Sequence, residues 1–172
     1  RHHTGQLVLR IEDTDQKRLD PTALATLTEA LRWAGLDWDE GPEVGGPYGP
    51  YTQSERLDMY QKWGKWLVEN GHAYYCYCSS ERLDAVNKEK MARKEPPGYD
   101  RRCRDLTPER EAELAAECEA EGRKPVIRFK FPLEGVIVFN DLVRGEVRFE
   151  NENHQDAVLL KSDGFPTYHL AV

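Results

Sequence analysis

The stretch that decides the fold is Leu7-Val8-Leu9-Arg10-Ile11-Glu12-Asp13-Thr14-Asp15, an apolar run whose end carries three carboxylates. Near-continuous hydrophobicity of this kind predicts a strand covered on both faces in a parallel sheet. The acids would then lie at the carboxyl edge of the sheet, where open α/β folds bind ligands, and could meet an ammonium or a metal ion. Alternatively, Asp13, Thr14 and Asp15 only turn the chain and cap the following helix.

Composition predicts an ordinary globular protein of 172 residues, with 39% apolar and 32% charged residues. No apolar run approaches the ~20 residues that span a bilayer, and no signal peptide is recognisable, so we expect a cytoplasmic protein without a membrane segment. The net charge of -7 argues against a nucleic-acid partner. However, most of this excess lies in the glutamate-rich residues 109–121, a pattern typical of one solvated helix face.

The first half of the chain predicts an α/β unit. Asp20-Pro21 is a helix start, with Asp20 as the cap and Pro21 in the first helical position, and Gly35 ends that helix. The glycine- and proline-rich residues 41–51 predict a structured surface loop. Residues 52–55 are typical of a capping box for a second helix, which Asn70-Gly71 ends.

The second half predicts an α+β arrangement. A strand is expected at residues 73–77, a charged helix at 80–94 and another helix from Thr107-Pro108 to Gly122. Four short β-type runs follow, separated by turn residues, at 126–131, 136–139, 146–149 and 157–160. A new segment begins at Phe165.

Three cysteines have a spacing that suggests a metal site. Cys76 and Cys78 form a close pair, and Cys103 follows at a distance, as in small domains held together by zinc. The fourth ligand would be Tyr99 or Asp105. Alternatively, these are ordinary buried cysteines, or Cys76 and Cys103 form a disulfide, which a reducing compartment disfavours.

Three motifs together resemble bacterial-type glutamyl-tRNA synthetases, a family of class I aminoacyl-tRNA synthetases. They occupy residues 9–15, residues 45–51 with 53–56, and residues 162–168, in the family's order. The resemblance implies an α/β fold: part of a Rossmann-type class I synthetase catalytic domain with an α+β acceptor-stem-binding insert. Residues 1–74 would be the first catalytic half without its first strand and signature, 75–161 the insert, and 162–172 the start of the second half.

The resemblance implies ATP-dependent ligation of glutamate to its tRNA through a glutamyl-adenylate. ATP with Mg²⁺, L-glutamate and tRNA would be the cofactors and partners of a monomeric full-length enzyme. Such catalysis rests on positioning and charge stabilisation, so no side-chain nucleophile is expected. Both nucleotide-binding signatures of the family are absent, so we expect this segment alone to be inactive. The alternatives are a tRNA-binding paralogue that does not activate glutamate, and a glutamyl-queuosine tRNA synthetase.

Individual roles follow from the same resemblance. Glu12 would lie by the amino group of the bound glutamate, and Tyr168 would line the same pocket. Asp15 and Arg18 would lie near the tRNA terminus, whereas Asp13 keeps a structural role. A carboxylate at a strand end can form a charge-assisted hydrogen bond to an ammonium, which agrees with the role of Glu12.

The cysteines also coincide with zinc positions of some family members. Those members use a histidine two residues after the last cysteine, where this chain has Asp105. Related glutamyl-queuosine synthetases resemble the Tyr-x3-Cys arrangement of Tyr99 and Cys103, which favours Tyr99. The expected content is one Zn²⁺ per chain, held by Cys76, Cys78, Tyr99 and Cys103.

Overall fold

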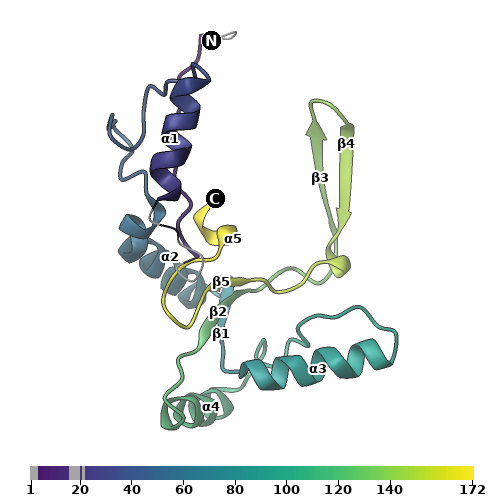
Figure 1. Cartoon of the computed structure of the whole chain (residues 1–172). Coiled ribbons are helices and arrows are strands. Elements are labelled where there is room, and N and C mark those ends of the chain that lie inside the picture. The colour runs from purple at the N-terminus through teal and green to yellow at the C-terminus, as the bar shows by residue number, and fades with distance from the viewer. Residues whose placement is uncertain (1–3, 16–19, 21) are drawn as a thin grey trace.

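The computed structural model describes residues 4–15, 20 and 22–172 of the chain. A small antiparallel sheet lies at its centre, and helices α1, α2 and α5 lie on one side of it (Figure 1). Helices α3 and α4 lie on the opposite side, and the hairpin β3–β4 stands away from the rest (Figure 1). In the described part of the chain, no helix is long and apolar enough to cross a membrane.

The predicted strand at residues 7–11 is wrong. This segment makes two isolated parallel bridges, Val8 with Glu40 and Ile11 with Thr52. A ladder needs one partner running alongside, but here two separate segments each supply a single bridge. Burial on both faces is wrong too, because Leu7 is 47% exposed and Val8 50%.

Helix α1 spans Ala23–Trp33 and begins later than predicted. The Asp20 carboxylate accepts hydrogen bonds from the Thr22 amide at 2.8 Å and from the Thr22 hydroxyl at 2.7 Å. Asp20 therefore stabilises the turn that precedes the helix. The cap itself is Thr22, and Pro21 lies outside the described residues. Gly35 ends the helix with a φ of +68°, as predicted.

The capping box predicted at residues 52–55 is also wrong. Thr52 makes no side-chain cap hydrogen bond, and a 3-10 turn, η1 (Gln53–Arg56), precedes helix α2 (Leu57–Glu69). Instead, the carboxylate of Asp13, which is distant in the sequence, accepts a hydrogen bond from the Ser54 amide at 2.8 Å. This bond gives Asp13 the structural role expected of it.

The central sheet contains β1 (Ala73–Cys76), β2 (Val126–Phe129) and β5 (Val158–Leu160), in the order β1-β2-β5 with antiparallel pairing. Tyr60 of α2 and Ala171 of α5 (Tyr168–Ala171) pack with Ile127 and Leu160 in one buried cluster. Gly64 allows this close packing, since a Cβ there would clash with Leu160. Helix α2, from the first half of the chain, and helix α5, at its end, therefore pack against the same sheet.

The two helices predicted in the second half of the chain are confirmed. Helix α3 (Ser80–Ala92) is capped by Ser79, and α4 (Pro108–Ala120) by Thr107. The glutamates of α4 face solvent except for the half-buried Glu111, which accepts a hydrogen bond from the Tyr77 hydroxyl at 3.2 Å. Leu114 and Cys118 are buried against β1 in a second core. The short turn η2 (Asn151–Asn153) precedes β5. The strands match the four predicted β-type runs.

Strands β3 (Val136–Asp141) and β4 (Gly145–Glu150) form the protruding hairpin. Their register places Ile137 opposite Phe149 and Phe139 opposite Val147, so one face is apolar. Phe139 and Phe149 are 46% and 44% exposed.

Candidate functional site

The three predicted cysteines meet at one point, which we call the cysteine cluster together with Tyr99. The sulfur atoms of Cys76, Cys78 and Cys103 all lie within 4.8 Å of one another, with 3.7 Å between Cys78 and Cys103. The Tyr99 hydroxyl is 3.3 Å from the Cys76 sulfur. Tetrahedral zinc with Zn–S bonds of about 2.3 Å separates its sulfur ligands by about 3.8 Å. The cluster therefore fits a zinc ion with three sulfur ligands and one oxygen ligand.

The fold brings these residues together from two places. Cys76 ends β1 and Cys78 follows two residues later, on the same side of the extended chain. The chain returns after α3, where the Tyr99 hydroxyl accepts the Cys103 amide at 2.9 Å. All three cysteines are free thiols, so the disulfide between Cys76 and Cys103 is not formed.

The structure distinguishes the two candidates for the fourth ligand. The Asp105 side chain is 70% exposed and pairs with Lys130 at 2.7 Å, away from the cysteines. Tyr99, by contrast, is within hydrogen-bond distance of Cys76. The arrangement favours Tyr99.

The hydrogen bonds within the cluster shift the pKa values of its members in opposite directions. Hydrogen bonds from the Cys103 and Cys78 thiols hold the pKa of Cys76 far below its usual value, despite burial. Burial and hydrogen bonds to the neighbouring sulfurs raise the pKa of Tyr99. The neighbouring donors therefore favour the thiolate form of Cys76, which is the form that ligates metals.

A buried carboxylate that the sequence did not reveal lies beside the cluster. Asp156 is 1% exposed and accepts hydrogen bonds from the Tyr74 hydroxyl at 2.7 Å and from Arg104 at 2.8 Å. It also accepts the Phe131 amide at 3.3 Å. Asp156 thus connects the strand before Cys76 to the turn that contains Cys103. A single acid between short strands carries no sequence signal for this role.

The second candidate site is the carboxylate edge, residues 10–15. The Glu12 carboxylate pairs with Arg10 at 2.5 Å, and both side chains are about one third exposed. With Asp13 and Asp15, they line a cleft of about 410 Å³, whose other wall is the start of α1. Arg18 lies outside the described residues.

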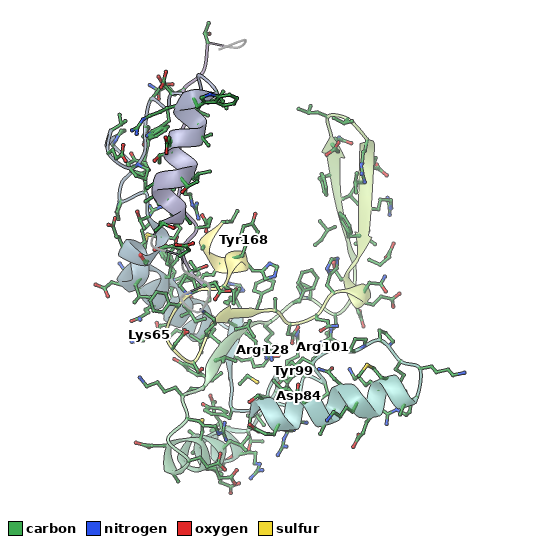
Figure 2. The ribbon with its side chains drawn as sticks, viewed as in Figure 1. Lys65, Asp84, Tyr99, Arg101, Arg128 and Tyr168 are labelled. Atoms are coloured by element: carbon green, nitrogen blue, oxygen red, sulfur yellow. The ribbon has the colours of Figure 1, made fainter. Side chains whose placement is uncertain are left out.

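The structure brings Glu12 and Asp15 to one cleft but leaves Tyr168 out of its lining. Tyr168 lies on α5 and is 61% exposed (Figure 2). The segment before α5 contacts the edge, because Lys161 donates to the Thr14 carbonyl at 3.0 Å. Helix α5 itself contacts α2, where the Tyr60 hydroxyl reaches the Ala171 carbonyl at 3.5 Å.

The predicted surface loop at residues 41–51 is ordered. The buried Tyr51 hydroxyl donates to Glu40 and accepts the Tyr48 amide at 3.1 Å. Gly46 has a φ of +143°, and a Cβ there would clash with the Glu40 side chain. The loop thus closes over Glu40, next to the bridge with Val8.

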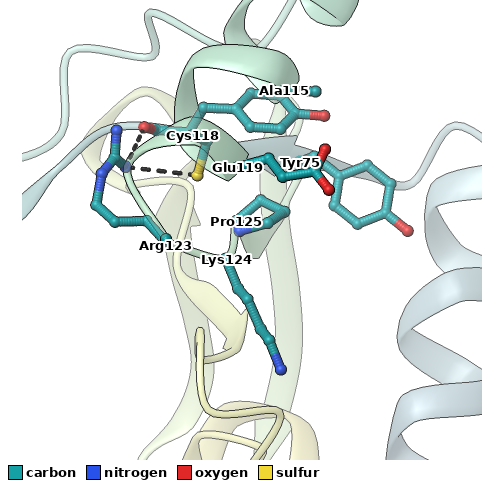
Figure 3. Close-up of a pocket in the computed structure, with 9 residues that line it drawn as sticks. Tyr75, Ala115, Cys118, Glu119, Arg123, Lys124 and Pro125 are labelled. Carbon is teal, nitrogen blue, oxygen red and sulfur yellow. Dashed lines mark hydrogen bonds between the residues drawn. The ribbon is translucent and has the colours of Figure 1, made fainter.

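A further pocket of about 490 Å³ lies between α4 and β1 (Figure 3). Arg123 at its rim donates to the Tyr77 carbonyl at 2.9 Å and to the Cys118 sulfur at 3.5 Å. Cys118 is 1% exposed and packs in the second core, so it has a structural role outside the cysteine cluster.

Comparison with known proteins gives a consistent result. The family model described as "tRNA synthetases class I (E and Q), catalytic domain" matches residues 1–172. A glutamate–tRNA ligase of Dehalococcoides mccartyi is 56% identical over 171 residues, covering 99% of this chain and 33% of the relative. One from Symbiobacterium thermophilum is 50% identical over 172 residues, covering 100% of this chain and 35% of the relative.

Solved structures agree. The crystal structure of a glutamate tRNA ligase from Elizabethkingia meningosepticum, in complex with its amino acid, matches with a TM-score of 0.87 and 39% identity. The match covers 99% of this chain and 34% of that one. The glutamate-tRNA synthetase from Elizabethkingia anophelis gives the same TM-score and identity, with 35% of that chain covered. The chain thus spans about a third of the length of these relatives.

Proposed function

Because this chain belongs to the class I tRNA synthetase family for glutamate and glutamine, and has its catalytic-domain fold, we propose that the full-length protein is a glutamate–tRNA ligase. It would use ATP to form a glutamyl-adenylate and transfer the glutamyl group to the terminal ribose of its tRNA. The observation that carries this proposal is the match along the whole chain, at 50–56% identity, to glutamate–tRNA ligases.

The carboxylate edge supports the glutamate-binding part of the proposal. Glu12 lies in an open cleft, and its carboxylate can accept a charge-assisted hydrogen bond from the substrate ammonium. Arg10 holds this carboxylate in place. Tyr168 would form another part of the pocket, and Asp15 with Arg18 would approach the tRNA terminus.

The cysteine cluster supports a structural zinc site. Cys76, Cys78, Cys103 and Tyr99 would hold one Zn²⁺, which would fasten the turn around Cys103 to the end of β1. Structural zinc sites are closed, four-coordinate and contribute directly to folding. This site would therefore shape the acceptor-binding insert and take no part in the chemical steps.

ATP and Mg²⁺ are inferred from the family. Among the described residues, Cys76, Cys78 and Cys103 are the one group of three or more His, Cys, Asp or Glu side chains close enough to share an ion. A monomeric state and a cytoplasmic location remain predictions. So does the division at residues 74/75 and 161/162, of which the first falls inside β1.

The test is an acylation assay on the full-length protein with labelled glutamate, ATP and purified tRNAs. The proposal predicts glutamate on the glutamate tRNA and none when ATP is omitted. Labelled glutamine serves as the matched control amino acid. Transfer to a queuosine-containing tRNA instead would support the glutamyl-queuosine alternative, and binding of tRNA without any acylation would support the inactive paralogue. Either result would overturn the proposed activity.

A further inference from the structure

Two arginines flank the cysteine cluster on different sides. Arg82 of α3 donates to the Cys78 sulfur at 3.4 Å. Arg128 of β2 stacks on the Tyr99 ring, with its guanidinium carbon 3.9 Å from the ring centre. Figure 2 shows Tyr99 and Arg128 together beside α3. Each arginine thus contacts one of the residues proposed as ligands.

Both guanidinium groups are fixed by other contacts. Asp100 clamps Arg82 through two hydrogen bonds, of 3.2 and 2.5 Å. Arg128 is only 8% exposed and donates to the Asp156 carbonyl at 2.9 Å. Its buried Nε has no hydrogen-bond partner in the described structure. Arg128 therefore brings a buried positive charge to the cluster without a carboxylate bound to it.

The charges explain why two cations would be needed. A Zn²⁺ ion with three thiolates and the neutral Tyr99 hydroxyl carries a net charge of −1, and Asp100 adds another negative charge beside it. Burying uncompensated charge is costly, whereas paired charges that are hydrogen-bonded are tolerated. Arg82 and Arg128 together supply two positive charges, which makes the assembly neutral.

We propose that Arg82 and Arg128 are positioning residues of the metal centre, which compensate its negative charge and orient Cys78 and Tyr99. This inference rests on the zinc site proposed above. Arg82 holds the Cys78 sulfur through its hydrogen bond. Arg128 stacks on the Tyr99 ring and so fixes its plane, with the Tyr99 hydroxyl 3.3 Å from the Cys76 sulfur. Residues that contact metal ligands in this way typically change metal affinity by about 10–100-fold when replaced.

The experiment measures zinc affinity of the full-length protein by competition with a chromophoric chelator. Arg82→Met and Arg128→Met keep most of the side-chain volume and remove the charge, and each should weaken zinc binding by about tenfold or more. Arg82→Lys keeps the charge and should retain most of the affinity. Arg110→Met is the matched control, because Arg110 pairs with Glu113 and Glu117 on the exposed face of α4 and loses the same charge.

A second readout separates charge compensation from a general structural role. The free energy of unfolding is measured with and without zinc for each variant. Charge compensation predicts a smaller zinc-dependent gain in stability, whereas a purely structural role lowers both values equally and would overturn the inference. If Arg128→Met does not fold, the inference is tested by the zinc affinity and stability of Arg82→Met and Arg82→Lys, because Arg82 is more exposed.

The remaining outcomes distinguish the two proposals. A wild-type protein that binds no zinc overturns the zinc site itself. A wild-type protein that binds one zinc, with unchanged affinity in both methionine variants or an equal loss in Arg110→Met, overturns only the role of the arginines.

Discussion

The cysteine cluster and the carboxylate edge are built in opposite ways. The cluster draws its ligand candidates from residues 76–103, and Cys76 and Cys103 are only 1% and 3% exposed. The edge depends on distant segments, since it is held by Glu40, Thr52 and Ser54, and its carboxylates face an open cleft. The first arrangement suits a structural ion that never leaves, and the second suits a substrate that must enter and leave.

Loss of a charged partner should also have different consequences in the two regions. In the buried region, a charge without its partner lowers the stability of the fold. At the open edge, solvent screens a charge that has lost its partner, so the loss affects ligand binding more than the stability of the fold. Substitutions in the two regions should therefore separate stability from activity.

The largest effect on stability is expected for Asp156→Asn. Removing the charge of the buried, hydrogen-bonded Asp156 leaves Arg104 with only the distant and exposed carboxylate of Asp105, at 3.9 Å, and should lower the free energy of unfolding by about 3–5 kcal/mol. Denaturant unfolding of the full-length protein measures it. Asp163→Asn is the control, because that carboxylate is 51% exposed and pairs with Lys161 at 3.4 Å. Equal stability of the two variants would contradict the expectation that losing a buried charge lowers stability more than losing an exposed one.

A large effect on activity, but not on stability, is expected for Glu12→Gln. The amide keeps the size of the side chain and can still accept from Arg10, but it loses the charge that would meet the substrate ammonium. Charge-assisted hydrogen bonds contribute about 1.5–3 kcal/mol, so kcat/KM for glutamate should fall about 10–100-fold. Steady-state acylation measures it.

The control for Glu12→Gln is Glu43→Gln, which alters another exposed pair with an arginine, Arg32. It should acylate like the wild-type protein. Unchanged kcat/KM in Glu12→Gln would mean that this carboxylate does not recognise glutamate.

A smaller effect is expected for Asp13→Ala. It removes the acceptor of the Ser54 amide and should lower stability by about 0.5–1.5 kcal/mol, with KM for glutamate unchanged. Asp13→Asn retains an acceptor oxygen and should restore most of the loss. A raised KM at normal stability would move Asp13 from the structural group to the substrate site.

The smallest effect is expected for Asp105→Asn. Asp105 pairs with Lys130 at the surface and not with the cysteines, so the zinc content and affinity should equal those of the wild-type protein. Metal analysis after dialysis measures it. Loss of zinc in this variant would make Asp105 the fourth ligand in place of Tyr99.

Features that depend on neighbouring residues could be predicted from the sequence. Thr107-Pro108 and Asn70-Gly71 mark helix ends because their capping and turn preferences act locally. The cluster could be proposed because Cys76 and Cys78 have metal-ligand spacing, and the family resemblance favoured Tyr99 over Asp105 as the fourth ligand.

Features that depend on distant residues could not be predicted. Thr52 has the pattern of a cap, but pairing with Ile11 determines its conformation. Residues 7–11 have the hydrophobicity of a buried strand, but strand formation depends on which segments lie alongside. Asp156 and Arg128 are single charged residues whose roles arise only when β1, β2 and the turn at Cys103 meet.

The most direct test of this account is zinc-edge X-ray absorption on the full-length protein and on its Tyr99→Phe variant. The account predicts one zinc per chain with three sulfur ligands at about 2.3 Å and one oxygen ligand at about 2.0 Å. In Tyr99→Phe, that oxygen contribution should be lost or replaced by water, and the metal should bind more weakly. The absence of zinc, or an identical spectrum and affinity in the two proteins, would contradict it.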